Sequence, residues 1–172
     1  MEQKISAAAT AELRAVDPSQ PFSKSLYNAL AHCMLSVAVE VVTLRVREGH
    51  VEVFLKRRAD DDSAYPGMLH VPGTVIRAKD VDGEHTYANA IGRAAQSECG
   101  AQVLDFEFIA EHFKHEPRGP FNCRVFLVRF KGEPTGGEWS KVDALPADVI
   151  AEHAAFVIPI AARRFKERFN VD

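Results

Sequence analysis

Hydrophobic positions recur at helical spacing in the first part of the chain, and at Val37 the spacing changes to that of strands. The Ala-rich segment 2–16 predicts a helix, and Asp17-Pro18 ends it because proline cannot continue a helix. Pro21 suits the first turn of a second helix, which carries apolar side chains at helical spacing as far as Cys33. We therefore predict an N-terminal helical appendage over residues 1–34.

The next segment has the composition of two strands joined by a tight turn. Segments 37–47 and 51–58 are rich in β-branched residues, and Glu48-Gly49-His50 separates them. This arrangement predicts a β-hairpin, because a glycine-containing turn between two such runs is the usual hairpin signal.

The middle of the chain alternates between loop, helix and strand patterns. Two Pro-Gly pairs mark 60–80 as a loop. The apolar spacing of 84–99 predicts a helix that ends at Gly100, a residue suited to the left-handed conformation that closes helices. Segments 103–110 and 121–131 predict two further strands, the second of them with clear alternation of side chains.

The last part of the chain predicts one short extended piece and two helices. Trp139 starts the extended piece, Leu145-Pro146 leads into a short helix, and the final helix begins near Pro159. The order of elements predicts one mixed α/β sandwich domain over residues 35–172, with the helical appendage in front of it.

Composition narrows the classes of partner. The net charge of −3 provides no positive field for nucleic acid or for a membrane surface, so we expect neither as a partner. Three widely spaced cysteines predict free thiols in a reducing compartment. No signal pattern and no apolar run near the ~20 residues of a membrane helix is found. These observations predict a cytoplasmic location.

Two stretches carry a family resemblance. Tyr65-Pro-Gly-Met-Leu-His-Val-Pro-Gly-Thr74, followed by Arg93-Ala-Ala-Gln-Ser-Glu-Cys-Gly-Ala101, resembles the Nudix box and the residues that lead into it. The resemblance covers roughly 37–165. It implies an α/β/α sandwich with a mixed sheet, and an enzyme that uses Mg²⁺ or Mn²⁺ to cleave a nucleoside diphosphate linked to another group.

The match keeps the scaffold of the box and loses most of its acids. Gly73, Arg93, Glu98 and Gly100 take the positions of the box glycines, arginine and last glutamate. The resemblance implies that Glu98 is a metal ligand or base and that Arg93 orients carboxylates. The chain departs from the pattern in two ways. Ala94 and Ser97 stand where the family has glutamates. The segment between Gly73 and Arg93 is longer than in the pattern, and the loop glutamate of the pattern falls on Lys79 or His85, with Glu84 one place away.

These departures bear directly on metal binding. Positions 94, 97 and 98 share one helix face, where three carboxylates would supply the oxygen ligands that Mg²⁺ requires. Glu98 alone predicts weak binding unless another acid assists. The resemblance implies that such an acid comes from the segment after the helix, which makes Glu111 and Glu116 the candidates.

Three arginines are candidates for binding phosphate. Arg57 and Arg58 end a predicted strand beside the box, and Arg77 lies inside the long loop that follows Gly73. The alternative for each of them is an ordinary solvated position.

Three functions stay open at this point. The first is a divergent hydrolase, and the second is a catalytically silent domain that binds a nucleotide or a protein. The third is an unrelated α/β domain. The N-terminal helices are a candidate surface for a homodimer or another partner.

Overall fold

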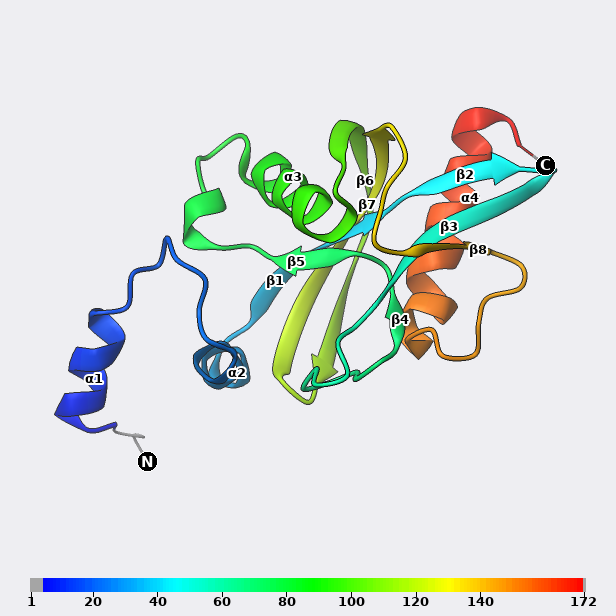
Figure 1. The fold of residues 1–172 in the computed structure, drawn as a ribbon. Coiled ribbons are helices and arrows are strands. Elements are labelled where there is room, and N and C mark those ends of the chain that lie inside the picture. Colours follow the sequence, from blue (N-terminus) through cyan, green and yellow to red (C-terminus); the bar gives the residue numbers. More distant parts are fainter. Residues whose placement is uncertain (1–4, 172) are drawn as a thin grey trace.

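The computed structural model describes residues 5–171, which form a mixed α/β domain preceded by two helices (Figure 1). The helices are α1 (Ala7–Arg14), α2 (Lys24–Cys33), α3 (Thr86–Cys99) and α4 (Ile158–Phe169), with a 3₁₀ turn η1 (Ala78–Asp80) and a π turn η2 (His153–Val157). The strands are β1 (Ser36–Val42), β2 (Leu44–Arg47), β3 (His50–Arg57), β4 (Leu69–His70), β5 (Gly73–Val75), β6 (Gln102–Glu116), β7 (Gly119–Lys131) and β8 (Glu138–Lys141).

Serine and glycine residues set several helix ends. The side chains of Ser6 and Ser23 accept hydrogen bonds from backbone N–H groups in the first turns of α1 and α2. The second helix therefore starts after Ser23 and not at Pro21. At the other end of α3, Gly100 has φ 58° and closes the helix as the sequence predicts.

The strands form two sheets, which are joined by the continuous segment that holds β1 and β2. The first sheet has the order β5-β1-β7-β6, in which β1 runs parallel to β7 and antiparallel to β5. The second sheet has the order β2-β3-β4, and β8 pairs antiparallel with residues 52–55 of β3. The single strand predicted over 37–47 is wrong, because Thr43 interrupts it and donates a side-chain hydrogen bond to Val128. This break passes the chain from one sheet to the other.

Helices cover both faces of the sheets, so the predicted α/β/α sandwich is confirmed (Figure 1). Ile91 and Ala94 of α3 pack with Val39, Val41 and Phe126. On the other side, α4 packs in a larger cluster; its contributing residues are Ile158, Ala161 and Phe165. Apolar burial on both faces is the main stabilisation of such a layered domain.

Three sequence predictions need correction. The segment 60–80 is not simply a loop, since it holds β4, β5 and η1. The strand predicted over 103–110 continues to Glu116 and forms a long hairpin with β7. After Leu145-Pro146 the chain makes turns and a bridge between Val149 and Leu69 before it becomes helical, because this segment pairs with β4.

The two N-terminal helices differ in how they meet the domain. No residue of α1 is buried, whereas α2 buries Ala31 against β1 and β7. Gly119, in the β6–β7 hairpin, permits this contact, because a Cβ there would stand 1.9 Å from the carbonyl oxygen of Ala31. Part of the predicted appendage is thus a wall of the domain.

Within residues 5–171, no helix combines the length and the apolar character needed to cross a bilayer. The cysteines Cys33, Cys99 and Cys123 are all unpaired, as their spacing predicts.

Candidate functional site

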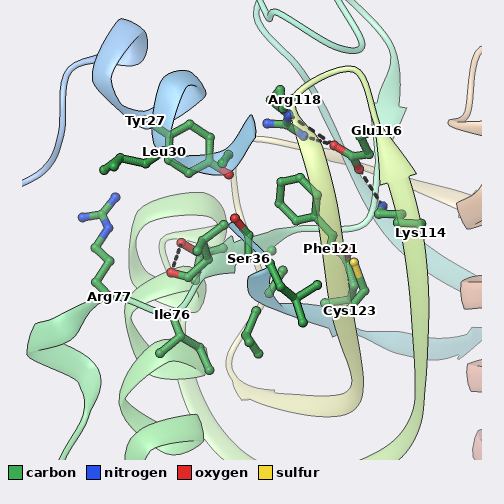
Figure 2. Close-up of a pocket in the computed structure, with 18 of the residues that line it drawn as sticks. Tyr27, Leu30, Ser36, Ile76, Arg77, Lys114, Glu116, Arg118, Phe121 and Cys123 are labelled. Carbon is green, nitrogen blue, oxygen red and sulfur yellow. Dashed lines mark hydrogen bonds and ion pairs between the residues drawn. The ribbon is translucent and has the colours of Figure 1, made fainter. Parts of the chain in front are cut away.

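A cavity of about 700 Å³ lies between α2, the β5 edge of the first sheet and the β6–β7 hairpin (Figure 2). Tyr27 and Leu30 of α2 lie over it, and Phe121 and Cys123 of β7 form part of the opposite wall. This size is in the usual range for sites that bind small molecules and cofactors. The helix α2 forms one wall of the cavity, while Ala31 packs against β1 and β7.

An ion-pair network forms one side of the cavity (Figure 2). The Glu116 carboxylate lies 2.8 Å from Nζ of Lys114 and 2.6 Å from Nη2 of Arg118. Lys114 also lies 3.3 Å from Glu152. Burial acts to raise the pKa of Glu116, but the hydrogen bonds and charges of Lys114 and Arg118 outweigh it and lower that pKa. Glu116 therefore stays ionised and holds two cations in place.

Three buried titratable groups are part of the cavity lining. Glu40 of β1, His70 of β4 and His153 of η2 are each at most 7% exposed. Burial, followed by the nearby charge of Arg58, lowers the pKa of His70 to about 3, and burial lowers that of His153 well below its usual value. Both imidazoles are thus neutral at physiological pH.

These three residues do not stand out as site residues in the sequence. Glu40 gave one usable signal, since it is the single charge inside the apolar run Val37-Ala-Val-Glu-Val-Val42. The two histidines gave none, because η2 and β4 come together only through the bridge between Val149 and Leu69.

The box glutamate is outside this cavity. Glu98 is not among the residues that line it, and its Oε2 lies 3.0 Å from Nζ of Lys56. Lys56 gave no signal in the sequence, because its side chain reaches Glu98 only after β3 has packed beside α3.

The residues around Glu98 do not fit the divalent metal that the resemblance implies. Ala94 and Ser97 carry no carboxylate; Ala94 is fully buried in the core and Ser97 is exposed. In the described part of the chain, no three Asp, Glu, His or Cys side chains are grouped so that they could hold a metal ion. A lysine ammonium takes the position beside Glu98 where a hard cation would need oxygen ligands.

Arg93 orients a carboxylate, but it is that of Asp80, which does not stand out as a site residue in the sequence. Its Nε and Nη2 lie 3.1 and 2.5 Å from the two oxygens of Asp80, and Nη1 lies 2.8 Å from Oγ1 of Thr74. Asp80 is 3% exposed, and burial acts against its charge, but the Arg93 hydrogen bonds and the Arg77 N–H lower its pKa overall. This paired contact fixes the long loop to α3.

The three candidate phosphate-binding arginines have different surroundings. Arg57 is held outside the cavity by the carbonyl of Gly67 and by Asp148, at 2.6 and 2.7 Å. Arg58 and Arg77 both line the cavity. Arg58 pairs with Asp62 at 2.9 Å, whereas the Arg77 guanidinium makes no ion pair or hydrogen bond within residues 5–171. Arg77 is therefore the cation most available to a ligand.

The other sequence candidates are also separated in space. Gly73 lines the cavity, as does Glu116, which is committed to the ion-pair network. Glu111 points away from it and pairs with Arg124 at 3.1 Å. The structure brings Gly73, Arg77, Arg58 and Glu116 to one cavity and leaves Glu98, Arg93, Arg57 and Glu111 outside it.

Comparison with solved structures defines the fold. The chain superimposes on a MutT NUDIX hydrolase from Burkholderia pseudomallei with a TM-score of 0.54 and 18% identity, covering 75% of this chain and 97% of that one. It superimposes on the NUDIX domain of Shewanella oneidensis NrtR, solved in complex with ADP ribose, with a TM-score of 0.61 and 14% identity, covering 84% and 99%. For a NUDIX hydrolase from Alicyclobacillus acidocaldarius the TM-score is 0.57 at 16% identity, covering 75% and 92%.

The chain has the Nudix fold, as the resemblance in its sequence implies. No protein-family model and no curated protein matches the sequence. At these identities the likeness establishes the architecture, and the activity has to be argued from the site itself.

Proposed function

We propose that this chain is a Nudix-fold binding domain that takes an anionic small molecule of nucleotide size into the cavity beneath α2, without a divalent metal. The observation that carries the proposal is that the cavity and the box glutamate are separate. The polar groups that converge on the cavity do not include Glu98, and Glu98 is already neutralised by Lys56.

The charges of the cavity support an anionic ligand. Arg77 offers a guanidinium without a carboxylate partner among the described residues, and guanidinium groups bind phosphate in a paired geometry. The side chains of Tyr27 and Tyr87 add aromatic surface on which a base or another flat group can lie. Two neighbours in fold give precedent for binding: the NUDIX domain of NrtR was solved with ADP ribose, and NrtR was also solved with a 27mer DNA.

The hydrolase function predicted from the sequence has less support than binding. It requires Mg²⁺ or Mn²⁺ at Glu98, where the second and third carboxylates are missing and a lysine is close. Metal-dependent cleavage of a nucleoside diphosphate derivative stays a prediction that the same experiment tests. The cytoplasmic location, the homodimer and the absence of a nucleic-acid partner also stay predictions.

Calorimetric titration with ADP-ribose and nucleoside mono- and diphosphates, in EDTA and then in Mg²⁺ or Mn²⁺, tests the proposal. We expect binding in EDTA and no release of phosphate or nucleotide in either metal. Arg77→Ala should weaken binding about 10-fold or more, as expected for loss of one charge-assisted contact. Arg163→Ala is the matched control, because Arg163 is an exposed arginine of α4 outside the cavity.

Two results would overturn this proposal. One is the absence of binding for every compound in the panel. The other is metal-dependent turnover that disappears in Glu98→Gln, which would establish the hydrolase instead.

A further inference from the structure

Glu40 is a buried carboxylate without a hydrogen-bond donor. It lies in β1, is 7% exposed, and lines the cavity. Among residues 5–171 no side chain or backbone group donates a hydrogen bond to it, and the nearest partner is Nε2 of His153 at 3.8 Å. Its oxygens are not among the fully buried side-chain atoms that lack a partner, so they remain accessible from the cavity that Glu40 lines. A largely buried carboxylate with unused acceptor positions is costly, and such groups are frequently found where a ligand completes them.

The backbone around Glu40 is shaped to leave its carboxylate room. Gly73 of β5 lies directly opposite Glu40 in the register of the two strands. A Cβ at position 73 would stand 2.8 Å from Oε2 of Glu40 and 2.6 Å from the carbonyl oxygen of Val39. The first box glycine therefore serves to admit this carboxylate.

The neighbours of Glu40 do not satisfy it. His153 accepts the Val71 N–H at Nδ1, 2.9 Å away, so its proton is on Nε2 and the ring is neutral. Lys114 is the cation that most lowers the pKa of Glu40, but it forms ion pairs with Glu116 and Glu152. Burial raises the pKa of Glu40 to about 6, against the opposing charges of Lys114 and Arg58, so the group is ionised at neutral pH.

The charge of the cavity also indicates what kind of donor fits. Arg58, Lys114 and Arg118 line the cavity but are paired with carboxylates, whereas Arg77 is an unpaired cation of its lining among the described residues, so a ligand with an anionic end is favoured over one that is purely cationic. A neutral group with two adjacent N–H donors can satisfy both oxygens of one carboxylate without adding positive charge. Guanine presents such a pair on its pairing edge, from N1–H and the 2-amino group.

The dimensions are compatible with a nucleotide held at both ends. Gly73 and Arg77 are four residues apart in an extended segment, which corresponds to roughly 13 Å at the usual rise of a strand. Glu40 lies beside the first of them, and the Arg77 guanidinium faces the cavity from the second (Figure 2).

We propose that Glu40 is the residue that selects the ligand, accepting hydrogen bonds from the paired N–H donors of a guanine-type edge while Arg77 binds the anionic end. This inference rests on the proposed binding function and adds its specificity. It predicts preference for guanine nucleotides over hypoxanthine nucleotides, which lack the 2-amino donor, and over adenine nucleotides, which present an acceptor beside a single donor.

The test compares GMP, IMP and AMP by calorimetry in EDTA with the full-length chain. We expect GMP to bind about 10- to 100-fold more tightly than IMP, the range for one charge-assisted hydrogen bond. Glu40→Gln should reduce GMP affinity by a similar factor and remove the difference between GMP and IMP. Glu138→Gln, on the exposed strand β8, is the matched control and should change neither.

The outcomes separate this inference from the proposed function. If the three nucleotides bind equally well and Glu40→Gln has no effect, the specificity is wrong and the binding function stands. If agmatine binds through Glu40 and GMP does not, the carboxylate recognises a guanidinium and the guanine assignment is wrong. If none of these compounds nor any in the wider panel binds, both proposals fail. Far-ultraviolet circular dichroism of each variant shows that a loss of binding is not a loss of fold.

Discussion

Replacing Glu40 by glutamine is expected to stabilise the protein at neutral pH, by an amount that depends on pH in a defined direction. The pKa of this carboxyl group is raised from 4.5 to about 6, because burial disfavours its charge and Lys114 and Arg58 offset only part of that effect. A carboxyl group with a higher pKa in the folded state binds its proton more tightly when folded. Its favourable contribution is therefore complete below pH 4.5 and is lost as the pH rises through about 6.

The magnitude follows from the two pKa values. The full difference corresponds to about 2 kcal/mol of unfolding free energy at pH well above 6. Glutamine does not titrate, so the gain of Glu40→Gln over the wild type should grow by about 1 kcal/mol between pH 5 and pH 7.5. Buried histidines such as His70 titrate in both proteins, and their contribution largely cancels in the comparison.

Urea denaturation followed by circular dichroism at several pH values measures this difference. Glu116→Gln is an informative comparison, because Glu116 is also buried but its pKa is lowered through Lys114 and Arg118. That variant should lose stability at neutral pH, with the loss shrinking in acid. A gain for Glu40→Gln that is constant with pH, or that shrinks as the pH rises, would refute the claim that Glu40 is an uncompensated charge.

Three further predictions concern the scaffold. Gly119→Ala should lower the free energy of unfolding by roughly 3 kcal/mol or more, because a backbone carbonyl of α2 occupies the space that the new Cβ would need. Gly49→Ala is the control in the same urea denaturation: its φ is also positive, at 77°, but nothing lies within 4 Å, so the loss should be about 1 kcal/mol. Ala94→Glu should destabilise by about 3 kcal/mol or more, with no recovery of the melting temperature in Mg²⁺, since position 94 is fully buried among apolar residues. Arg93→Ala should cost about 3 kcal/mol by leaving Asp80 buried and unpaired, and adding Asp80→Asn should recover part of the loss in a double-mutant cycle.

The energetic cost of Glu40 also bears on function. If Glu40→Gln stabilises the protein as expected from the raised pKa of Glu40, the packing of β1 does not require a carboxylate at this position. Residues that lower stability in a cavity are characteristic of sites that bind or react. The stability measurement and the nucleotide titrations therefore examine the same side chain by independent observables.

Much of the fold could be predicted from local pattern. The β-hairpin around Gly49, the helix closed by Gly100 and the alternating strand over 121–131 all follow from spacing and turn residues, and the structure confirms them. The sequence misled where pairing was decided by distant partners. Thr43 reads as part of one strand but leaves it, and β4 and β5 are too short to give a periodic signal.

The sequence by itself predicted the Nudix fold and the loss of most acidic positions of the box, because Gly73, Arg93, Ala94, Ser97 and Gly100 all lie on one loop and the helix that follows it. Only the tertiary structure decided where polar groups gather. Glu40 reaches the cavity through the β1–β5 register, and its histidine neighbour comes from a turn far along the chain. Hydrogen-bond registers and the packing of α2 create this cavity, and neither is encoded in the spacing of any single segment.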